Sequence, residues 1–170
     1  KFVTLTADIM FVNGVAFLVT LSRRIRLVTT EHIPTRTAKQ LSSSLDKIVR
    51  LYTRGGFTVK VILMDQEFDK VENEMGLVEI NTSAAREHVG EIERRIRVIK
   101  ERARGTISVL PYEALPKLMV IELLHFCVMW LNAFPVKSGI SKKFSPRELV
   151  SRHKLDAKLH CKSHLGAYCE

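Results

Sequence analysis

The chain has 170 residues, 46% of them hydrophobic and 26% charged, a composition that fits one folded domain of ordinary size and excludes a disordered chain. Its formal net charge of +9 and pI near 9.7 indicate an anionic partner, with nucleic acid as the first candidate. The three cysteines are too widely spaced for a disulfide framework. The most apolar segment, residues 118–134, contains Glu122, His125 and Asn132, so we predict a core helix there and no membrane span.

Two runs of β-branched and large apolar residues open the chain, over residues 3–10 and 15–21, and Asn13-Gly14 lies between them. Asn-Gly favours a two-residue hairpin turn because both turn positions need positive φ. Residues 25–30 predict a third strand of the same meander. Asp8 lies inside the first strand, where a carboxylate is unfavourable unless another group pairs or chelates it. Because the chain begins directly in a strand, we expect it to be a piece of a longer protein.

A helix is predicted over residues 35–52, where apolar side chains recur at helical spacing and Gly55-Gly56 follows as a stop signal. The next apolar run, from Val59, is short enough for a buried strand and ends at Asp65. A strand that follows a crossover helix lies parallel to an earlier strand, and ligands gather beyond the carboxyl ends of such strands. An isolated aspartate at this place is more commonly a turn or helix N-cap residue, so both interpretations of Asp65 stay open at this point.

Three antiparallel strands, a crossover helix and a parallel strand that ends in an acid form the plan of the ribonuclease H-like fold. We therefore predict an α/β protein of this fold, with a mixed five-stranded sheet flanked by helices. Residues 70–75 predict a short helix and 77–80 the fifth strand. A long charged helix is predicted over 86–104, with a buried apolar stripe made of Val89, Ile92, Ile96 and Ile99. Pro111 and Pro116 open an apolar helix that runs through Trp130, and Ser145-Pro146 starts a short helix. The first and fourth strands are neighbours in this plan, so Asp8 and Asp65 can meet across them.

The long charged helix carries the most specific motif of the sequence. Residues 92–94 read Ile-Glu-Arg, and Arg97, Glu101 and Ala103-Arg104 follow. Further matches read Leu-Pro-Lys at 115–117, Leu-Asn-Ala-Phe-Pro at 131–135 and Phe-Ser-Pro-Arg-Glu-Leu at 144–149. In these stretches the sequence resembles the catalytic core of retroelement integrases, most closely the copia-type branch of LTR retrotransposons, and with Asp8 and Asp65 the resemblance spans most of the chain. There the third catalytic acid lies in a motif of the form A-E-R-x-N-R-x-L-x-E-x-A-R.

The resemblance implies an integrase core from a retrotransposon polyprotein, a metal-dependent polynucleotidyl transferase that processes DNA 3′ ends and joins them to target DNA during DNA integration. It implies Asp8, Asp65 and Glu93 as the catalytic acids and as the ligands of Mg²⁺ or Mn²⁺. Magnesium prefers oxygen ligands, and phosphoryl transfer uses such cations to clamp the attacking and leaving oxygens. No Ser-His or Cys-His arrangement in the sequence argues for a covalent protein intermediate.

Two signals disagree on the third acid. In retroviral integrases about thirty-five residues separate the second aspartate from the glutamate, and counting from Asp65 then selects Glu101. The motif selects Glu93, with a shorter loop before it. We follow the motif, because loops change length more readily than a helix changes its face. Glu87 and Glu91 are weaker alternatives near the start of the helix, where an acid is often only a favourable partner of the helix dipole.

Basic residues follow Glu93 along the same helix. Arg97 and Lys100 come four and seven residues later and therefore share its face. The resemblance implies that such side chains hold DNA phosphates, and we predict Arg94, Arg97, Lys100 and Arg104 as DNA-binding residues. The alternative is a solvated helix face with intrahelical ion pairs, for example between Glu93 and Arg97.

The sequence departs from the family pattern in its active-site loops. Asp65 is followed directly by Gln66-Glu67-Phe68, where the family has Asn-Gly-Gly-Glu-Phe, and residues 84–90 replace the usual Pro-Gln-Gln-Asn-Gly loop. Ile96 stands where the helix motif has Asn. An inactive or domesticated copy that serves as a DNA-binding or interaction module therefore stays an alternative, as does a ribonuclease H-type nuclease.

We predict the catalytic core over residues 1–134 and a C-terminal extension over 135–170, made of a loop, a short helix and the start of a strand within 159–169. The His and Cys residues of the extension lack the paired spacing of zinc sites (His153, His160, Cys161, His164 and Cys169). The expected partners are DNA, both as element ends and as target, and further copies of the chain in a homo-oligomer. The expected location is the nucleus, after a cytoplasmic particle stage.

Overall fold

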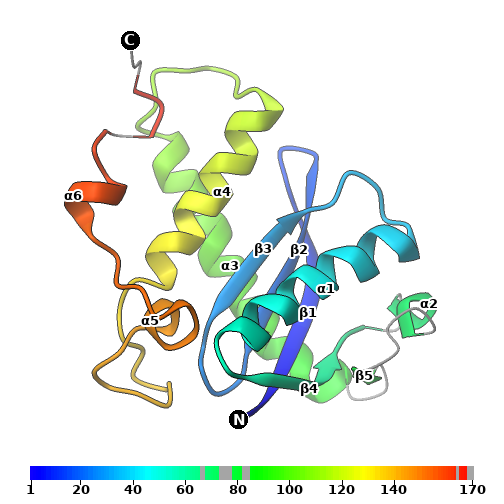
Figure 1. Cartoon of the computed structure of the whole chain (residues 1–170). Coiled ribbons are helices and arrows are strands. Elements are labelled where there is room, and N and C mark those ends of the chain that lie inside the picture. The colour runs from blue at the N-terminus through cyan, green and yellow to red at the C-terminus, as the bar shows by residue number, and fades with distance from the viewer. Residues whose placement is uncertain (66–67, 73–77, 82–84, 164, 168–170) are drawn as a thin grey trace.

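Five strands form one sheet in the order β3-β2-β1-β4-β5 in the computed structural model of the chain (Figure 1). The structure describes residues 1–65, 68–72, 78–81, 85–163 and 165–167. The strands are β1 (Phe2–Val12), β2 (Val15–Ser22), β3 (Val28–His32), β4 (Thr58–Leu63) and β5 (Glu79–Asn81). β1 pairs antiparallel with β2 and parallel with β4, which confirms the predicted mixed sheet and makes β1 its central strand.

The β1–β2 hairpin forms where Asn13-Gly14 predicted it. Both turn residues have positive φ, 47° at Asn13 and 75° at Gly14, and Val12 pairs with Val15 across the turn. The antiparallel ladder continues through the pair of Asp8 and Val19, so Asp8 is held at a defined position within the central strand.

The third strand begins later than predicted. The sequence predicted residues 25–30, whereas β3 spans 28–32. A tight turn takes up the residues before it: the Ser22 N–H donates to the Leu27 carbonyl oxygen at 3.0 Å, and the φ of Arg26 is 66°. The β-branched character of this run did not reveal the turn, because the turn is built by backbone hydrogen bonds across it.

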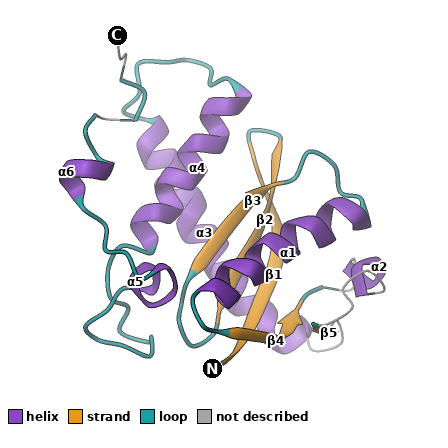
Figure 2. Ribbon diagram, in the orientation of Figure 1, coloured by secondary structure: helices purple, strands orange, loops and turns teal. Residues whose placement is uncertain are grey.

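Helices cover both faces of the sheet (Figure 2). They are α1 (Ala38–Arg54), α2 (Asp69–Glu72), α3 (Ala85–Ile107), α4 (Lys117–Leu131), α5 (Pro146–Ser151) and α6 (Ala157–His160). α1 packs over one face, and α3 with α4 packs over the other. The predicted helix at 70–75 and strand at 77–80 correspond to α2 and β5, and their residues 73–77 lie outside the described part of the chain.

Alternation along β1 divides the core into two clusters. Leu5 and Ala7 pack with α1, whereas Met10 packs with α3 and α4. Asp8 is separated from Met10 by two positions, so it belongs to the face that α3 covers. On α3 itself, Ile92 and Ile99 are buried in the second cluster, as the predicted apolar stripe required.

Local signals set the ends of α1 and α5. The Thr37 side chain accepts a hydrogen bond from Gln40 N–H at 3.3 Å and caps α1. Ser145 and Glu148 form a reciprocal capping box at the start of α5, where the sequence predicted a serine cap.

In the C-terminal extension the start of a strand was expected within residues 159–169, of which 164 and 168–169 lie outside the described residues. Residues 157–160 form α6, and no strand lies between residue 135 and residue 163. Asp156 caps this single turn through the Lys158 N–H at 2.9 Å. This local cap accounts for the helical turn that includes Leu159 and His160, and the predicted strand and the predicted domain boundary at residue 134 stay predictions. Among the described residues, none of the helices has the length and apolar character needed to cross a membrane.

Candidate active site

A pocket of about 340 Å³ opens between β1 and α3. Acidic and basic side chains from these two elements line it, together with two isoleucines: Asp8, Ile9, Glu93, Ile96, Arg97, Lys100 and Arg104. The sequence predicted five of these residues as catalytic or DNA-binding, and they come from positions 8 and 93–104 of the chain. The tertiary structure therefore brings two of the three predicted acids to one place.

The central strand positions Asp8. The residue is half-buried, and its Oδ1 accepts a hydrogen bond from the Ile9 N–H at 2.7 Å. This contact orients one carboxylate oxygen, because a backbone donor within a strand ladder cannot move independently of the sheet. A carboxylate in the middle of a sheet is energetically unfavourable unless another group pairs or chelates it. The Asp8 carboxylate faces a pocket.

Helical periodicity positions the opposite wall. Glu93, Arg97, Lys100 and Arg104 follow one another at spacings of four, three and four residues, so their side chains form one stripe along α3. Ile99 belongs to the neighbouring stripe, is 0% exposed and anchors the helix to the sheet. The same helix thus packs with one side and presents charges to the pocket with another.

The structure separates the competing glutamates. Glu93 lines the pocket with Asp8, whereas Glu101 is exposed and is not among the lining residues. Glu91 points elsewhere and is engaged by two arginines. The side chain of Glu87 lies outside the described part of the structure. Of the described alternatives, Glu93 is the one that shares a pocket with Asp8.

Asp65 is not brought into this pocket. The β1–β4 ladder ends at the pair of Thr6 and Leu63, and Asp8 and Asp65 each come two residues later, so the backbone register points to matching positions on neighbouring strands. Asp65, however, lies beyond the end of β4 and is exposed, and its carbonyl oxygen accepts the Phe68 N–H at 3.0 Å. The strand register therefore places Asp65 and Asp8 at corresponding positions of neighbouring strands, but Asp65 does not line the pocket.

The described part of the chain does not assemble a cage of three carboxylates. Within the described residues, no group of three or more His, Cys, Asp or Glu side chains is placed to hold a metal ion. Asp8 and Glu93 are nevertheless a donor pair of the kind that Mg²⁺ uses, since magnesium is often held by one or two carboxylates together with water and substrate phosphate. Asp8 and Glu93 are therefore the residues of this pocket that would hold such a cation, and the metal-ligand role of all three acids stays a prediction.

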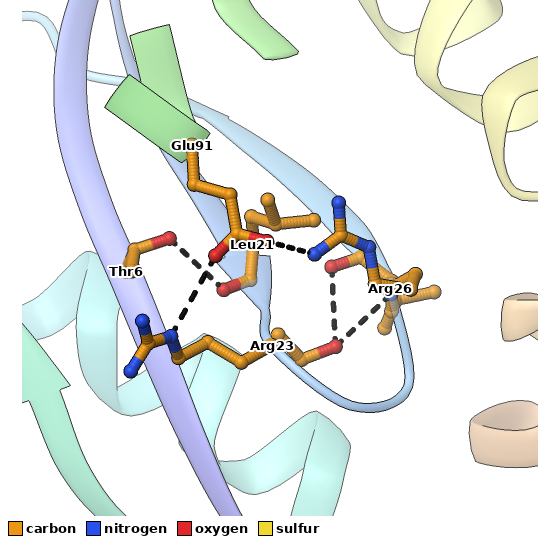
Figure 3. A network of polar contacts seen from close by, with 7 residues as sticks. Thr6, Leu21, Arg23, Arg26 and Glu91 are labelled. Carbon is orange, nitrogen blue, oxygen red and sulfur yellow. Dashed lines mark hydrogen bonds and ion pairs between the residues drawn. The ribbon is translucent and has the colours of Figure 1, made fainter. Parts of the chain in front are cut away.

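The neighbouring Glu91 is held by two arginines of the β2–β3 turn (Figure 3). Arg26 contacts one carboxylate oxygen, and the Nε of Arg23 lies 3.6 Å from the other. Partial burial alone raises the pKa of the Glu91 carboxyl, but the hydrogen bond and charge of Arg26 and the charge of Arg23 outweigh it, so the pKa lies below its ordinary value. This contact ties the turn to α3.

The arginines of α3 differ in how far they are exposed to solvent. Arg94, predicted to bind DNA, is exposed and is not among the pocket-lining residues. Arg95 is half-buried, and burial followed by the charges of Arg26 and Arg102 lowers its pKa. The sequence reasoning missed the pairing of Arg23 and Arg26 with Glu91; the available signal was the run of arginines at positions 23, 24 and 26.

Solved structures show which class of fold this is. The catalytic core domain of BIV integrase matches with a TM-score of 0.59 and 18% identity over 94% of this chain and 97% of that one. A chain in the intasome of simian T-cell lymphotropic virus, in complex with the PP2A regulatory subunit B56 gamma, matches with a TM-score of 0.65 and 17% identity over 90% of this chain and 55% of that one. The HTLV-2 integrase catalytic core domain, in complex with magnesium and in a trimeric form, matches with a TM-score of 0.61 and 14% identity over 86% and 95%.

These similarities define the chain as a ribonuclease H-like domain with the fold of retroviral integrase catalytic cores. The predicted fold class is therefore confirmed. At 14–18% identity the similarity shows the fold alone. No protein-family model matches the sequence, and no curated protein gives a significant match. The chain therefore shares the fold of integrase catalytic cores.

Proposed function

We propose that this chain is the catalytic core of a copia-type retrotransposon integrase, a metal-dependent polynucleotidyl transferase acting on DNA ends. One observation carries the proposal: Asp8 of the central strand and Glu93 of α3 line one pocket, and the other charged residues that line it are all basic. The integrase-core fold supports the reaction class. The motif around Glu93 supports the copia-type branch.

The two carboxylates are suited to hold Mg²⁺ or Mn²⁺ from opposite walls of the pocket. When bound, such a cation supplies Lewis-acid stabilisation of a phosphodiester and of the oxygen that attacks it. The contribution of the protein is to keep the carboxylates in place: Asp8 through the strand ladder and Glu93 through the buried side of α3. We further propose Asp65 as a third ligand, on the basis of its matching position along the neighbouring strand.

The basic stripe of α3 is suited to bind the DNA backbone beside the acids. Arg97, Lys100 and Arg104 line the same pocket as Glu93, so a phosphate bound by them lies next to the carboxylate pair. Their charges offset the negative charge of the DNA and of the transition state, which is the main protein contribution to phosphoryl transfer. The proposed partners are therefore element-end DNA and target DNA. We propose that the chain acts as a homo-oligomer, and that it acts in the nucleus after a cytoplasmic particle stage.

A DNA cleavage and joining assay tests the proposal, in the presence of Mg²⁺ or Mn²⁺ and with the full polypeptide that contains this chain. Asp8→Asn is expected to reduce the rate by more than about 100-fold, because it removes charge from the reacting centre. The matched control is Glu101→Gln, on the exposed side of α3, which should retain the rate of the wild type. Equal losses in both variants, with both folded, would contradict the assignment of the pocket.

Asp65→Asn decides how many acids the reaction uses. A loss as large as that of Asp8→Asn means that Asp65 joins the pair when DNA and metal are present. Retention of at least about half of the wild-type rate means that Asp8 and Glu93 act alone. DNA affinity should persist in both variants, since phosphate binding rests on the basic stripe.

A second candidate function is a DNA-binding module without catalysis. The observation in its favour is that the described residues do not assemble three metal-binding side chains. In this case the wild type binds DNA but shows no metal-dependent cleavage or joining. For both functions, Arg97→Ala and Lys100→Ala should each flatten the salt dependence of binding by about one unit, whereas Arg50→Ala, exposed on α1, should leave it unchanged.

A further inference from the structure

A second and larger pocket, of about 520 Å³, lies at the end of the β1–β2 hairpin. Its walls come from the hairpin, from the segment between β3 and α1, and from the start of α4. It shares no described lining residue with the candidate active site. Leu115 and Lys117 belong to one of the stretches that resemble the integrase family, but the proposed reaction does not use this pocket, so its chemistry is judged from its own residues.

Three elements each contribute a basic side chain to this pocket. Arg36 comes from the segment before α1, Lys117 is the first residue of α4, and His32 is the last residue of β3. The Arg36 guanidinium lies 5.7 Å from the centroid of the Phe11 ring, which holds the cation over the aromatic face. The described residues that line the pocket include no Asp or Glu.

The surroundings of His32 are positively charged. Partial burial lowers the pKa of His32, and the charges of Lys117 and His125 lower it further. Of the acids on adjoining elements, Glu122 contacts His125 at 3.8 Å and Glu31 contacts Lys47 at 3.7 Å. Neither carboxylate lines the pocket, and each already contacts a basic side chain outside it.

The start of α4 adds to this field. Its N-cap is Pro116, which provides no capping hydrogen bond from a side chain, and its first turn contains no acidic residue. The amino end of a helix carries partial positive charge and favours an anion. This contribution is secondary, because Arg36 and Lys117 already bring two permanent cations from separate elements.

We propose that this pocket binds a phosphate group through Arg36 and Lys117. His32 lines the same pocket. Arginine and lysine form charge-assisted hydrogen bonds with phosphate oxygens, and a site with two permanent cations and no described lining carboxylate suits either a phosphodiester or a phosphate ester. The phosphate belongs either to a nucleic acid strand or to a small phosphate ester. The site does not depend on the proposed catalytic function, since no residue is shared.

The test compares two probes, inorganic phosphate and a DNA oligonucleotide, on the folded chain. The double variant Arg36→Gln/Lys117→Gln should weaken binding of the effective probe by at least about tenfold, because two charge-assisted hydrogen bonds are lost. The matched control is Arg50→Gln/Lys142→Gln, which removes the same charges from exposed positions outside both pockets and should change affinity by less than about threefold.

His32 provides a second readout by NMR titration. Phosphate bound at this site should raise the pKa of His32 in the wild type but not in the double variant. If inorganic phosphate is sufficient, the site takes a free phosphate group; if only the oligonucleotide raises the pKa of His32, the site takes the strand backbone. Equal weakening in the double variant and in the control, or no response of His32 to either probe, would overturn the proposal. Loss of DNA cleavage in Asp8→Asn, with phosphate binding retained, would separate this site from the active site.

Discussion

Glu91 and Glu93 are the same residue type two positions apart on α3, yet they have different surroundings. Glu91 is paired with Arg26 and Arg23 of the β2–β3 turn, whereas Glu93 lines a pocket with Asp8. Two positions turn the side chain by about 200° around a helix of 3.6 residues per turn. The angular position on α3, rather than the presence of an acid, therefore decides whether a glutamate stabilises the fold or is a candidate catalytic residue.

Burial distinguishes the two glutamates energetically. The side chains of Glu91 and Arg26 are 32% and 13% exposed, so their pairing is partly shielded from water. An ion pair of this kind contributes more than an exposed one, and loss of one partner leaves the other without compensation. Glu93 is exposed on the pocket wall, where the protein does not depend on it for packing.

The largest expected effect is the loss of activity in Glu93→Gln. The rate of DNA cleavage or joining should fall by more than about 100-fold, because a charge at the reacting centre is removed. The free energy of unfolding should change by less than about 0.5 kcal/mol, as for other exposed substitutions. Parallel rate measurements and urea denaturation check this. A variant that unfolds markedly more easily would place Glu93 with Glu91, as a structural residue.

Glu91→Gln should show the opposite pattern in stability. We expect a loss of about 1–2 kcal/mol in the free energy of unfolding, between the values typical of exposed and of fully buried ion pairs. Glu101→Gln, exposed on the same helix, is the matched control for the charge change. Chemical denaturation of the three proteins measures the difference, and equal stability of Glu91→Gln and Glu101→Gln would contradict the structural role of Glu91.

A double-mutant cycle sharpens the comparison by separating the two arginines. Arg26→Met keeps a side chain at the position where φ is 66°, so the backbone strain cancels in the cycle. The coupling of Glu91 with Arg26 should be about 1 kcal/mol. The coupling with Arg23, which is 40% exposed and 3.6 Å away, should be only about 0.3 kcal/mol. A larger coupling of Glu91 with Arg23 than with Arg26 would show that the more exposed Arg23 is the residue that links the turn to α3.

The smallest effect is a dependence on pH. The pKa of Glu91 lies below its ordinary value of 4.5 in the folded chain, so its stabilising contribution is present above pH 4.5 and is lost as the pH falls through the lower folded value. The difference in unfolding free energy between wild type and Glu91→Gln should therefore shrink on acidification below this pH. Denaturation curves at a series of acidic pH values measure it, and a difference that widens toward low pH has the wrong sign for the proposed pairing.

Local sequence signals determined the elements that depend on a few adjacent residues. Asn13-Gly14 predicts its own turn because positive φ is required there. Ser145-Pro146 predicts a helix start, and the capping box that the structure shows there closes within four residues. Periodicity along 86–104 likewise predicted a helix with one buried side. Such features need no knowledge of the rest of the fold, which is why the sequence was sufficient for them.

Gly55 shows how a correct prediction can have an incomplete reason. The sequence predicted a helix stop at Gly55-Gly56, and Gly56 does take the positive φ of 80°. Gly55 has an ordinary helical conformation, but a Cβ at this residue would lie 2.5 Å from the Val150 carbonyl oxygen of α5. The need for glycine at this position arises from a segment nearly a hundred residues away.

The tertiary structure alone decided which charges meet. Glu91 and Arg26 are 65 positions apart, and the buried Asn132 side chain bonds the Val28 N–H and carbonyl oxygen at the edge of β3 across 104 positions. The pocket that joins Asp8 to Glu93 follows from the packing of α3 on β1, whereas Asp65 lies past the last ladder pair of β4. Sequence spacing cannot determine such contacts, because they depend on how whole elements pack, and side chains remote along the chain become neighbours only once that packing is complete.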